Sequence, residues 1–218
     1  VAVRVAERIA AVAPRAWVIN FTNPAGMITE AMRGVLGDRV VGICDSPLGL
    51  VRRAAAALGL DPARTFPHYA GLNHLGWLTG LEHDGEDVLP RLLADDEALR
   101  HTEEGRLFGP EWLRTIAAIP NEYLYYYYFT REAIAGITAA GRTRGELLLD
   151  QQERFYAAAL RRPDEALAEW RRARRERDAS YMAEAREATD AGERDPADLE
   201  AGGYEGVALA LMAALARG

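Results

Sequence analysis

Cys44, Asp45 and His74 are the side chains of this sequence best suited to metal binding or proton transfer. Cys44 is the only cysteine of the chain and ends an apolar run at residues 40–44. His74 follows further on, between small and apolar neighbours. A thiolate and an imidazole together suit Mn²⁺, Fe²⁺ or Zn²⁺. The alternatives are a small buried cysteine and a core histidine satisfied by backbone groups.

Asp45 has two interpretations that the residues leave open. A carboxylate beside a metal-binding cysteine serves as a general acid or base, or orients a ligand. It serves equally well as the N-cap of the helix that Ser46 and Pro47 open.

Tyrosine and arginine supply the other reactive side chains. A tyrosine run at residues 123–128 is typical of packing, and a phenol becomes a base only where a cation lowers its pKa from about 10. Arg142 and Arg144 stand near a helix start. They would clamp a phosphate or carboxylate there, or lie solvated at the helix end.

The first part of the chain predicts a parallel sheet that would position Cys44. Two apolar strands, at residues 17–21 and 40–44, alternate with helices. Short connections between such elements indicate right-handed crossovers in a doubly wound α/β sheet. Cys44 then lies at the carboxyl end of a strand, where ligands bind in such sheets. Asn23 is predicted as the N-cap of the second helix, with Pro24 at its first position.

From residue 61 onward the pattern changes to antiparallel strands and further helices. Asp84-Gly85 predicts a hairpin turn, because both residues tolerate positive φ. Helices are predicted at residues 89–100, 112–119, 133–140, 145–160 and 164–189, and from residue 203 onward. The predicted domains are therefore 1–60 and 61–218.

The amino-acid composition of the chain argues against some classes of binding partner and indicates a cellular compartment. The net charge of −7 argues against nucleic acid as a main partner. No apolar run approaches the roughly 18 residues of a membrane span, so no membrane partner is expected. A single cysteine fits a reducing, cytoplasmic location. Both ends fall within helical patterns, so we expect the chain to be part of a longer protein.

Six segments in this order resemble glycoside hydrolase family 4, the NAD- and Mn²⁺-dependent phosphoglycosidases. They are INFTNPAGMITEA, VVGICDSP, GLNHLGW, IPNEYLYYYYF, GRTRGE and GGYEGVAL. The resemblance implies an α/β fold: the C-terminal part of a Rossmann-like (lactate/malate dehydrogenase-like) domain, followed by an α+β substrate or catalytic domain. It places the family's main NAD-binding loop before Val1.

The resemblance also implies roles for individual residues. Cys44 and His74 resemble the metal ligands, and Tyr123 resembles the catalytic base, with Tyr126 and Tyr127 as alternatives. Asp45 resembles a general acid for the leaving group. The positions that resemble substrate-binding residues are Asn20, Asn23, Asn73 and Arg144.

The implied reaction is hydrolysis of a phosphorylated disaccharide or glycoside. NAD oxidises C3 of the sugar, tyrosine removes the C2 proton, the aglycone is eliminated and water adds. A 6-phospho-β-glucosidase is favoured, with a 6-phospho-α-glucosidase or α-galactosidase as alternatives, since Asp45 fits the family's α pattern and Ser46 fits neither. A homo-oligomer, either a dimer or a tetramer, is expected.

Two alternative hypotheses assign the protein to other functional classes. A lactate/malate dehydrogenase-like oxidoreductase has a related sheet but needs no metal. An inactive fragment or assembly module would instead use the helix predicted at residues 164–189.

Overall fold

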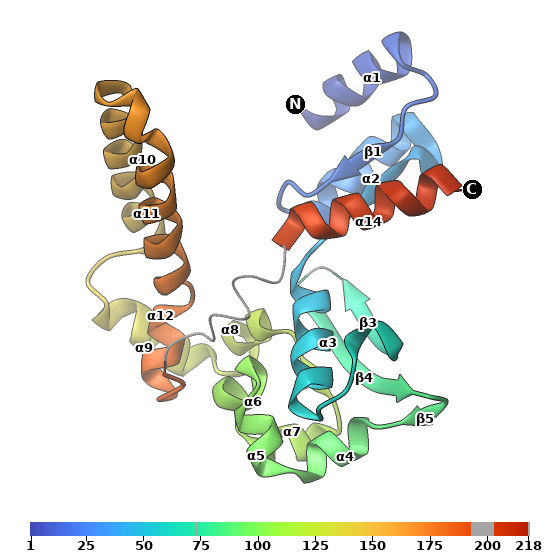
Figure 1. Ribbon diagram of the computed structural model, residues 1–218, viewed down its shortest axis with the longest axis vertical. Coiled ribbons are helices and arrows are strands. Elements are labelled where there is room, and N and C mark those ends of the chain that lie inside the picture. Colours follow the sequence, from blue (N-terminus) through green and yellow to red (C-terminus); the bar gives the residue numbers. More distant parts are fainter. Residues whose placement is uncertain (73, 193–202, 218) are drawn as a thin grey trace.

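The first part of the chain is a small α/β unit around two parallel strands. In the computed structural model, which describes residues 1–72, 74–192 and 203–217, α1 (Ala2–Val12) and α2 (Ala25–Leu36) flank β1 (Val18–Asn20) and β2 (Val40–Gly42) (Figure 1). Val18 pairs with Val40 in parallel register. The apolar faces meet in a small core of Ala6, Met32, Leu36 and Val40. The predicted parallel pair is confirmed.

The start of α2 differs from the prediction. Its N-cap is Pro24 in an extended conformation, so Asn23 lies one residue too early and the predicted Asn23 cap is wrong. The Asn23–Pro24 peptide bond is cis. Asn20 holds this turn instead: its amide donates to the Ala25 carbonyl at 3.2 Å and to Thr29 Oγ1 at 3.1 Å.

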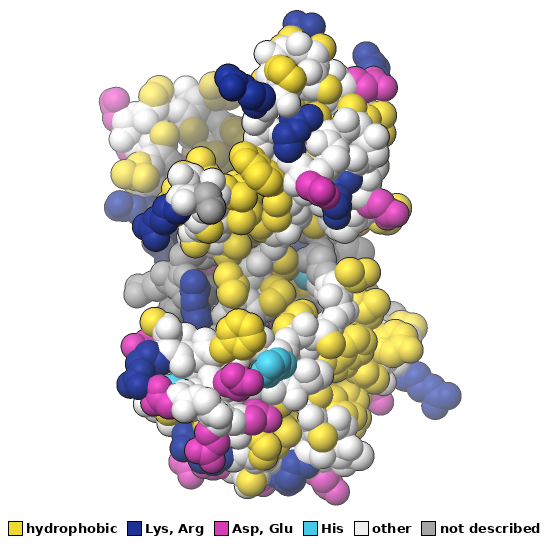
Figure 2. Space-filling model, turned by 90° about the vertical axis from the view of Figure 1, so that its right-hand side faces the viewer, with side chains coloured by type: hydrophobic (Ala, Val, Ile, Leu, Met, Phe, Trp, Pro, Cys, Tyr) yellow, Lys and Arg dark blue, Asp and Glu magenta, His cyan; other side chains and the backbone are white. Residues whose placement is uncertain are grey.

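The second part is built on an antiparallel sheet. After α3 (Ser46–Ala57), β3 (Thr65–Leu72) pairs with β4 (Leu75–His83), which also pairs with β5 (Glu86–Asp87) and β6 (Ile119–Pro120). Asp84 and Gly85 both have positive φ, 53° and 85°, which confirms the predicted turn. Figure 2 faces the side of the molecule where this hairpin lies, and apolar atoms gather there in patches among polar ones. Phe66, Leu72 and Leu75 of the hairpin are exposed.

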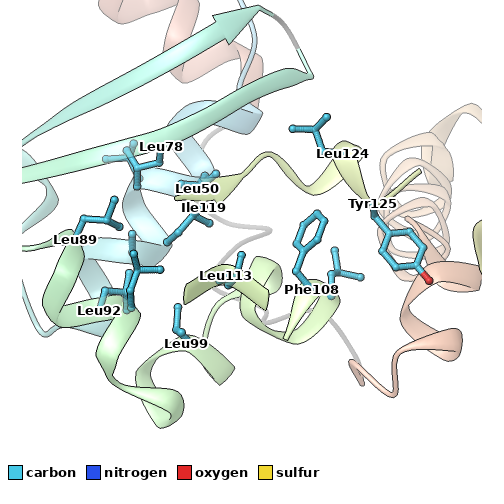
Figure 3. Packing of buried hydrophobic residues seen from close by; sticks show 14 of the residues in the cluster. Leu50, Leu78, Leu89, Leu92, Leu99, Phe108, Leu113, Ile119, Leu124 and Tyr125 are labelled. Atoms are coloured by element: carbon cyan, nitrogen blue, oxygen red, sulfur yellow. The ribbon is translucent and has the colours of Figure 1, made fainter. Parts of the chain in front are cut away.

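Short helices follow and share one buried core with this sheet. They are α4 (Leu89–Ala94), α5 (Asp96–Arg100), α6 (Glu103–Phe108), α7 (Pro110–Ile116), α8 (Tyr125–Tyr128) and α9 (Thr130–Ala139). Figure 3 shows their leucines meeting Ile119 from β6. The helix predicted at 89–100 is two helices, because Asp95 is extended and caps α5 through the Glu97 and Ala98 amides. The helix predicted at 112–119 ends at Ile116, because Ala117 turns left-handed and residues 119–120 join the sheet.

Helix α3 belongs to the larger core, although the sequence grouped it with the first 60 residues. Leu50, Val51 and Ala54 are buried in the same cluster as Leu78 and Leu89. The small unit and the larger core therefore separate in packing between β2 and α3, at Cys44 and Asp45.

A helical hairpin of α10 (Arg144–Arg161) and α11 (Ala166–Ala179) projects from the body (Figure 1). The single helix predicted at 164–189 is wrong. The chain turns left-handed at Met182 (φ 49°) and continues as α12 (Ala183–Ala188). This turn buries Met182 and Ala185 in the main core, which a straight helix would leave in solvent.

The last described helix, α14 (Gly203–Arg217), returns to the first unit and lies beside β1 and α2 (Figure 1). The rings of Phe21 and Tyr204 are 5.5 Å apart. The described part of the chain also contains 3₁₀ turns at η1 (Gly37–Arg39), η2 (Pro62–Arg64), η3 (Glu122–Leu124) and η4 (Pro163–Glu165). Across residues 1–72, 74–192 and 203–217, no helix is both long and apolar enough to cross a bilayer.

Gly105 allows α5 and α6 to approach closely, which gives a stability prediction. A Cβ at Gly105 would lie 1.8 Å from the Leu99 carbonyl oxygen, so alanine forces backbone to move. We expect Gly105→Ala to lower the free energy of unfolding by about 3 kcal/mol. Gly34→Ala, in α2 with nothing within 4 Å of the added Cβ, is the control and should raise it by about 0.5–1 kcal/mol. Urea unfolding measures both, and equal midpoints would contradict the proposed contact.

Candidate active site

A cavity of about 390 Å³ lies where the small unit, the larger core and the helical hairpin meet. Its walls come from the residue before the Pro24 cap of α2, the start of α3, His74 in the β3–β4 turn, η3, the start of α10, the end of α11 and the start of α14. The lining residues are Asn23, Asp45, Ser46, Gly49, Arg52, Arg53, His74, Glu122, Tyr123, Arg144, Arg177, Asp178, Tyr181, Gly203 and Tyr204. Five residues singled out from the sequence thus share one cavity: Asn23, Asp45, His74, Tyr123 and Arg144.

Asp45 is the N-cap residue of α3, but its side chain makes no capping hydrogen bond. Pro47 stands in the first turn, and Asp45 accepts the Gly49 amide only through its main-chain carbonyl. The carboxylate instead lines the cavity. The local structure therefore leaves the Asp45 side chain available for an acid or base role.

His74 and Tyr123 form the aromatic wall of the cavity. His74 has a φ of 60° in the β3–β4 turn, and its ring stacks on Tyr123 with centroids 4.0 Å apart. Burial lowers the pKa of His74, against the opposing charges of Glu122 and Asp45. A lowered pKa favours the neutral imidazole, which is the form that binds metals.

Tyr123 alone lines the cavity among the tyrosines at 123–128, all of which the structure describes. Burial raises the pKa of the Tyr123 phenol, and a hydrogen bond with Tyr181 opposes that rise. Tyr125 is buried in the core, and the Tyr126 hydroxyl donates to Glu184 Oε1 at 2.6 Å. Tyr127 is 68% exposed. The fold thus separates one tyrosine from its neighbours.

Cys44 lies beside this cavity and opens on a neighbouring groove of about 890 Å³, which Pro24, Gly26 and Tyr69 also line. Tyr204 joins the two spaces, because its side chain is hydrogen-bonded to both Cys44 and Asn23. Burial raises the pKa of the Cys44 thiol, while hydrogen bonds from Ser46 and Tyr204 act against this rise.

One asparagine predicted to bind substrate, Asn20, is not among the cavity-lining residues. Asn20 is buried, and its side chain is engaged with Ala25, Thr29 and the Thr22 amide, so its described contacts hold the turn before α2. Asn73 lies outside the described residues. A contact of either with substrate stays a prediction.

Arg144 lines the cavity while also closing the end of α11. Its guanidinium donates to the Ser180 carbonyl at 2.5 Å and to the Arg177 carbonyl at 3.3 Å. It also lies 5.6 Å from the centre of the Tyr181 ring. A cation at a helix C-terminus is favourable, so these contacts fix the guanidinium at the cavity wall.

Several lining residues were not assigned from the sequence. Glu122 adjoins Tyr123, and Tyr204 lies in the GGYEGVAL segment, so proximity to motifs could have indicated both. Tyr181 carries no such signal. Arg53 is set in place by a buried pair with Glu104, with Nη2 to Oε1 at 2.5 Å and Nε to Oε2 at 3.2 Å.

The described residues include few side chains that could bind a metal ion. Within 1–72, 74–192 and 203–217, no group of three or more His, Cys, Asp or Glu side chains is placed to hold an ion. His74 lines the cavity, and Cys44 lines the neighbouring groove. An ion bound by two protein ligands would need further oxygens from water or from a bound molecule.

The arrangement combines carboxylates, phenols, an imidazole and several arginines around one cavity. Such a set can position a polyhydroxy or anionic ligand and move protons at two points of it.

Two family models together cover most of the chain. Residues 1–60 match the family 4 glycosyl hydrolase model, and residues 69–218 match the model of the family 4 glycosyl hydrolase C-terminal domain.

Curated relatives and solved structures agree with these matches. A Bacillus subtilis protein named "Probable 6-phospho-beta-glucosidase" is 33% identical over 66% of this chain and 34% of its own length. A maltose-6′-phosphate glucosidase of Clostridium acetobutylicum is 30% identical over 65% of this chain and 36% of its own length. The chain thus spans about a third of the length of these relatives.

Among solved structures, the 6-phospho-beta glucosidase of Thermotoga maritima superposes with a TM-score of 0.57 at 26% identity. The match covers 69% of this chain and 37% of the other, and that structure contains manganese, NAD⁺ and glucose-6-phosphate.

Proposed function

The chain belongs to glycosyl hydrolase family 4, and we propose that the natural protein hydrolyses O-glycosidic bonds of 6-phosphoglycosides with NAD and a divalent metal. A 6-phospho-β-glucosidase is the favoured activity. The substrate class follows the relatives' names and the glucose-6-phosphate in the Thermotoga maritima structure.

One observation carries the proposal. Asp45, His74 and Tyr123 come from three distant stretches of chain, yet all three line a single cavity. They are the residues that the family resemblance implied for acid, metal ligand and base. Unrelated packing would have no reason to gather these three residue types at one point.

Each of these residues has a stated task in the proposed reaction. The Tyr123 oxygen takes the proton from C2 of the sugar. Asp45 delivers a proton to the leaving oxygen at C1, since its carboxyl group is not used for capping. Asn23 and Arg144 line the same space and hold the sugar and its phosphate.

The side chains at the site are of types that bind a divalent metal and NAD. Cys44 and His74 would hold a divalent transition metal through sulfur and nitrogen, and Mn²⁺ would in addition take oxygens from water or from the bound sugar. The groove beside Cys44 lies at the carboxyl ends of parallel strands, where dinucleotides bind in open α/β sheets. When bound, NAD accepts and returns a hydride, and the metal stabilises negative charge on sugar oxygens and lowers the pKa of nearby acids.

The anomer is the specific part of the proposal. Matching relatives include both a 6-phospho-β-glucosidase and maltose-6′-phosphate glucosidases. Asp45, which follows the metal-ligand cysteine, fits the α pattern of the family, and the Tyr-rich segment at 119–129 favours the β group. A 6-phospho-α-glucosidase is therefore the second candidate.

The test is a substrate screen of the natural full-length protein with NAD⁺, Mn²⁺ and a reductant. Nitrophenyl α- and β-glucosides are compared with and without a 6-phosphate. We expect turnover of the 6-phospho-β-glucoside, at least about tenfold faster than the unphosphorylated form, as loss of a bidentate phosphate contact predicts. Turnover that persists in chelator and without NAD⁺ would contradict the proposal. Net NADH formation from a hydroxy acid would support the dehydrogenase alternative instead.

We also retain a cytoplasmic homo-oligomer as part of the proposal. Cys44 is a free thiol, which suits a reducing compartment. The projecting hairpin exposes large apolar side chains, among them Leu149, Leu160 and Trp170, which a second copy would cover. Sedimentation velocity distinguishes a dimer or tetramer from a monomer.

A further inference from the structure

Glu122 is a buried carboxylate at the cavity wall that no task described so far requires. It is 4% exposed and belongs to η3, directly before Tyr123. One oxygen, Oε1, accepts the Tyr181 hydroxyl at 3.1 Å. The other, Oε2, makes no hydrogen bond with any residue that the structure describes. A buried carboxylate with so few partners is costly to keep, so its location calls for a reason.

Tyr181 connects this carboxylate to Tyr123. Its hydroxyl donates its one proton to Glu122, so its oxygen is left to accept the hydrogen bond from the Tyr123 hydroxyl. The two tyrosine rings pack edge to face with centroids 5.9 Å apart. Arg144 lies 5.6 Å from the Tyr181 ring centre and is itself fixed on the end of α11. Tyr181 is therefore held both at its hydroxyl and at its ring face.

We propose that Glu122 and Tyr181 are positioning residues that hold the Tyr123 phenol at the proton-transfer point of the cavity. The inference rests on the proposed function, in which Tyr123 is the base. His74 stacks on one side of the phenol, which fixes its plane but not the direction of its oxygen. The chain Glu122–Tyr181–Tyr123 supplies that direction, since each hydroxyl is tied to the next polar atom.

The chain contains a matched pair for comparison. The Tyr126 hydroxyl, from α8, donates to Glu184 Oε1, from α12, at 2.6 Å, which is a part-buried tyrosine–glutamate contact of the same type as that of Tyr181 with Glu122. Neither Tyr126 nor Glu184 lines the cavity. Loss of the Tyr126 hydroxyl therefore has a similar structural cost without access to the reaction.

The kinetic test compares Tyr181→Phe, Glu122→Ala and Tyr126→Phe in the natural full-length protein on the 6-phosphoglycoside. We expect Tyr181→Phe and Glu122→Ala each to lower kcat by about 10- to 100-fold with KM within about twofold, the scale of a misplaced catalytic group. The double variant should be no slower than the slower single variant, because both act through one chain. Glu122→Gln keeps an acceptor oxygen and should retain more kcat than Glu122→Ala. Tyr126→Phe should stay within about twofold of the wild type.

A second readout is independent of turnover. In protein labelled with ¹³Cζ-tyrosine, the Tyr123 resonance should shift in Tyr181→Phe and stay in place in Tyr126→Phe. An equal loss of kcat in Tyr126→Phe, multiplied losses in the double variant, or an unmoved Tyr123 resonance each overturn the inference. If the wild type turns over no phosphoglycoside, the proposed function fails, and the resonance alone decides whether Tyr181 positions Tyr123.

Discussion

Tyr123→Phe is expected to lower kcat by about 10²–10⁴-fold, the usual contribution of a positioned general base. The ring and its stacking on His74 remain, so the cavity keeps its shape and only the oxygen is lost. KM should change little, because a group that acts in the transition state contributes little to ground-state binding. Kinetics in deuterated water provide a direct check, since the wild type should incorporate deuterium at C2 of the sugar and the variant should not.

Tyr127→Phe is the control for this prediction. It lies in the same tyrosine run but is 68% exposed, and it should leave kcat within about twofold of the wild type. A large loss in Tyr127→Phe together with an active Tyr123→Phe would move the base along the run and contradict the assignment from the cavity.

Cys44→Ser and His74→Ala are expected to weaken Mn²⁺ binding and to reduce turnover at least about 100-fold at fixed Mn²⁺, since each removes one of the two proposed protein ligands. Serine is a much weaker ligand than a thiolate, and alanine supplies none. Burial keeps the pKa of His74 low, so its nitrogen should stay available to the ion as the pH falls below neutrality. Electron paramagnetic resonance of free Mn²⁺ measures the affinity without reference to activity.

His68→Ala is the matched histidine control. His68 lies on β3 and pairs with Glu82 at 2.7 Å on the exposed hairpin, away from the cavity-lining residues. It should leave Mn²⁺ affinity and turnover unchanged. Unaltered Mn²⁺ affinity in both Cys44→Ser and His74→Ala would remove the pair from the metal shell, whatever the activity of the variants.

The local elements of this site were predictable, because they depend on neighbours in sequence. The apolar run ending at Cys44 fixes a strand, and the Asp84-Gly85 pair fixes a turn. The break at Met182 was not predictable, because residues 164–189 form an unbroken helical pattern. The helix breaks at this point because Met182 and Ala185 are buried in a core formed by residues far away in sequence.

The same limit applies to the roles of single residues. Only the family resemblance indicated that Asp45, His74 and Tyr123 belong to one site, because their separation in sequence does not determine their distance in space. It could not tell that Asn20 is used inside a turn, or that Tyr181 and Tyr204 reach Tyr123 and Cys44. Those contacts depend on how helices from the later part of the chain return to the earlier part.

The packing of α3 has a consequence for how relatives can recombine. A chimaera joined at residue 60 would separate Leu50 and Val51 from the larger core against which they pack. A crossover between Cys44 and Asp45 would preserve that core, but it would split the thiol from the neighbouring carboxylate. Neither exchange point therefore takes both the larger core and the Cys44–Asp45 pair from one parent.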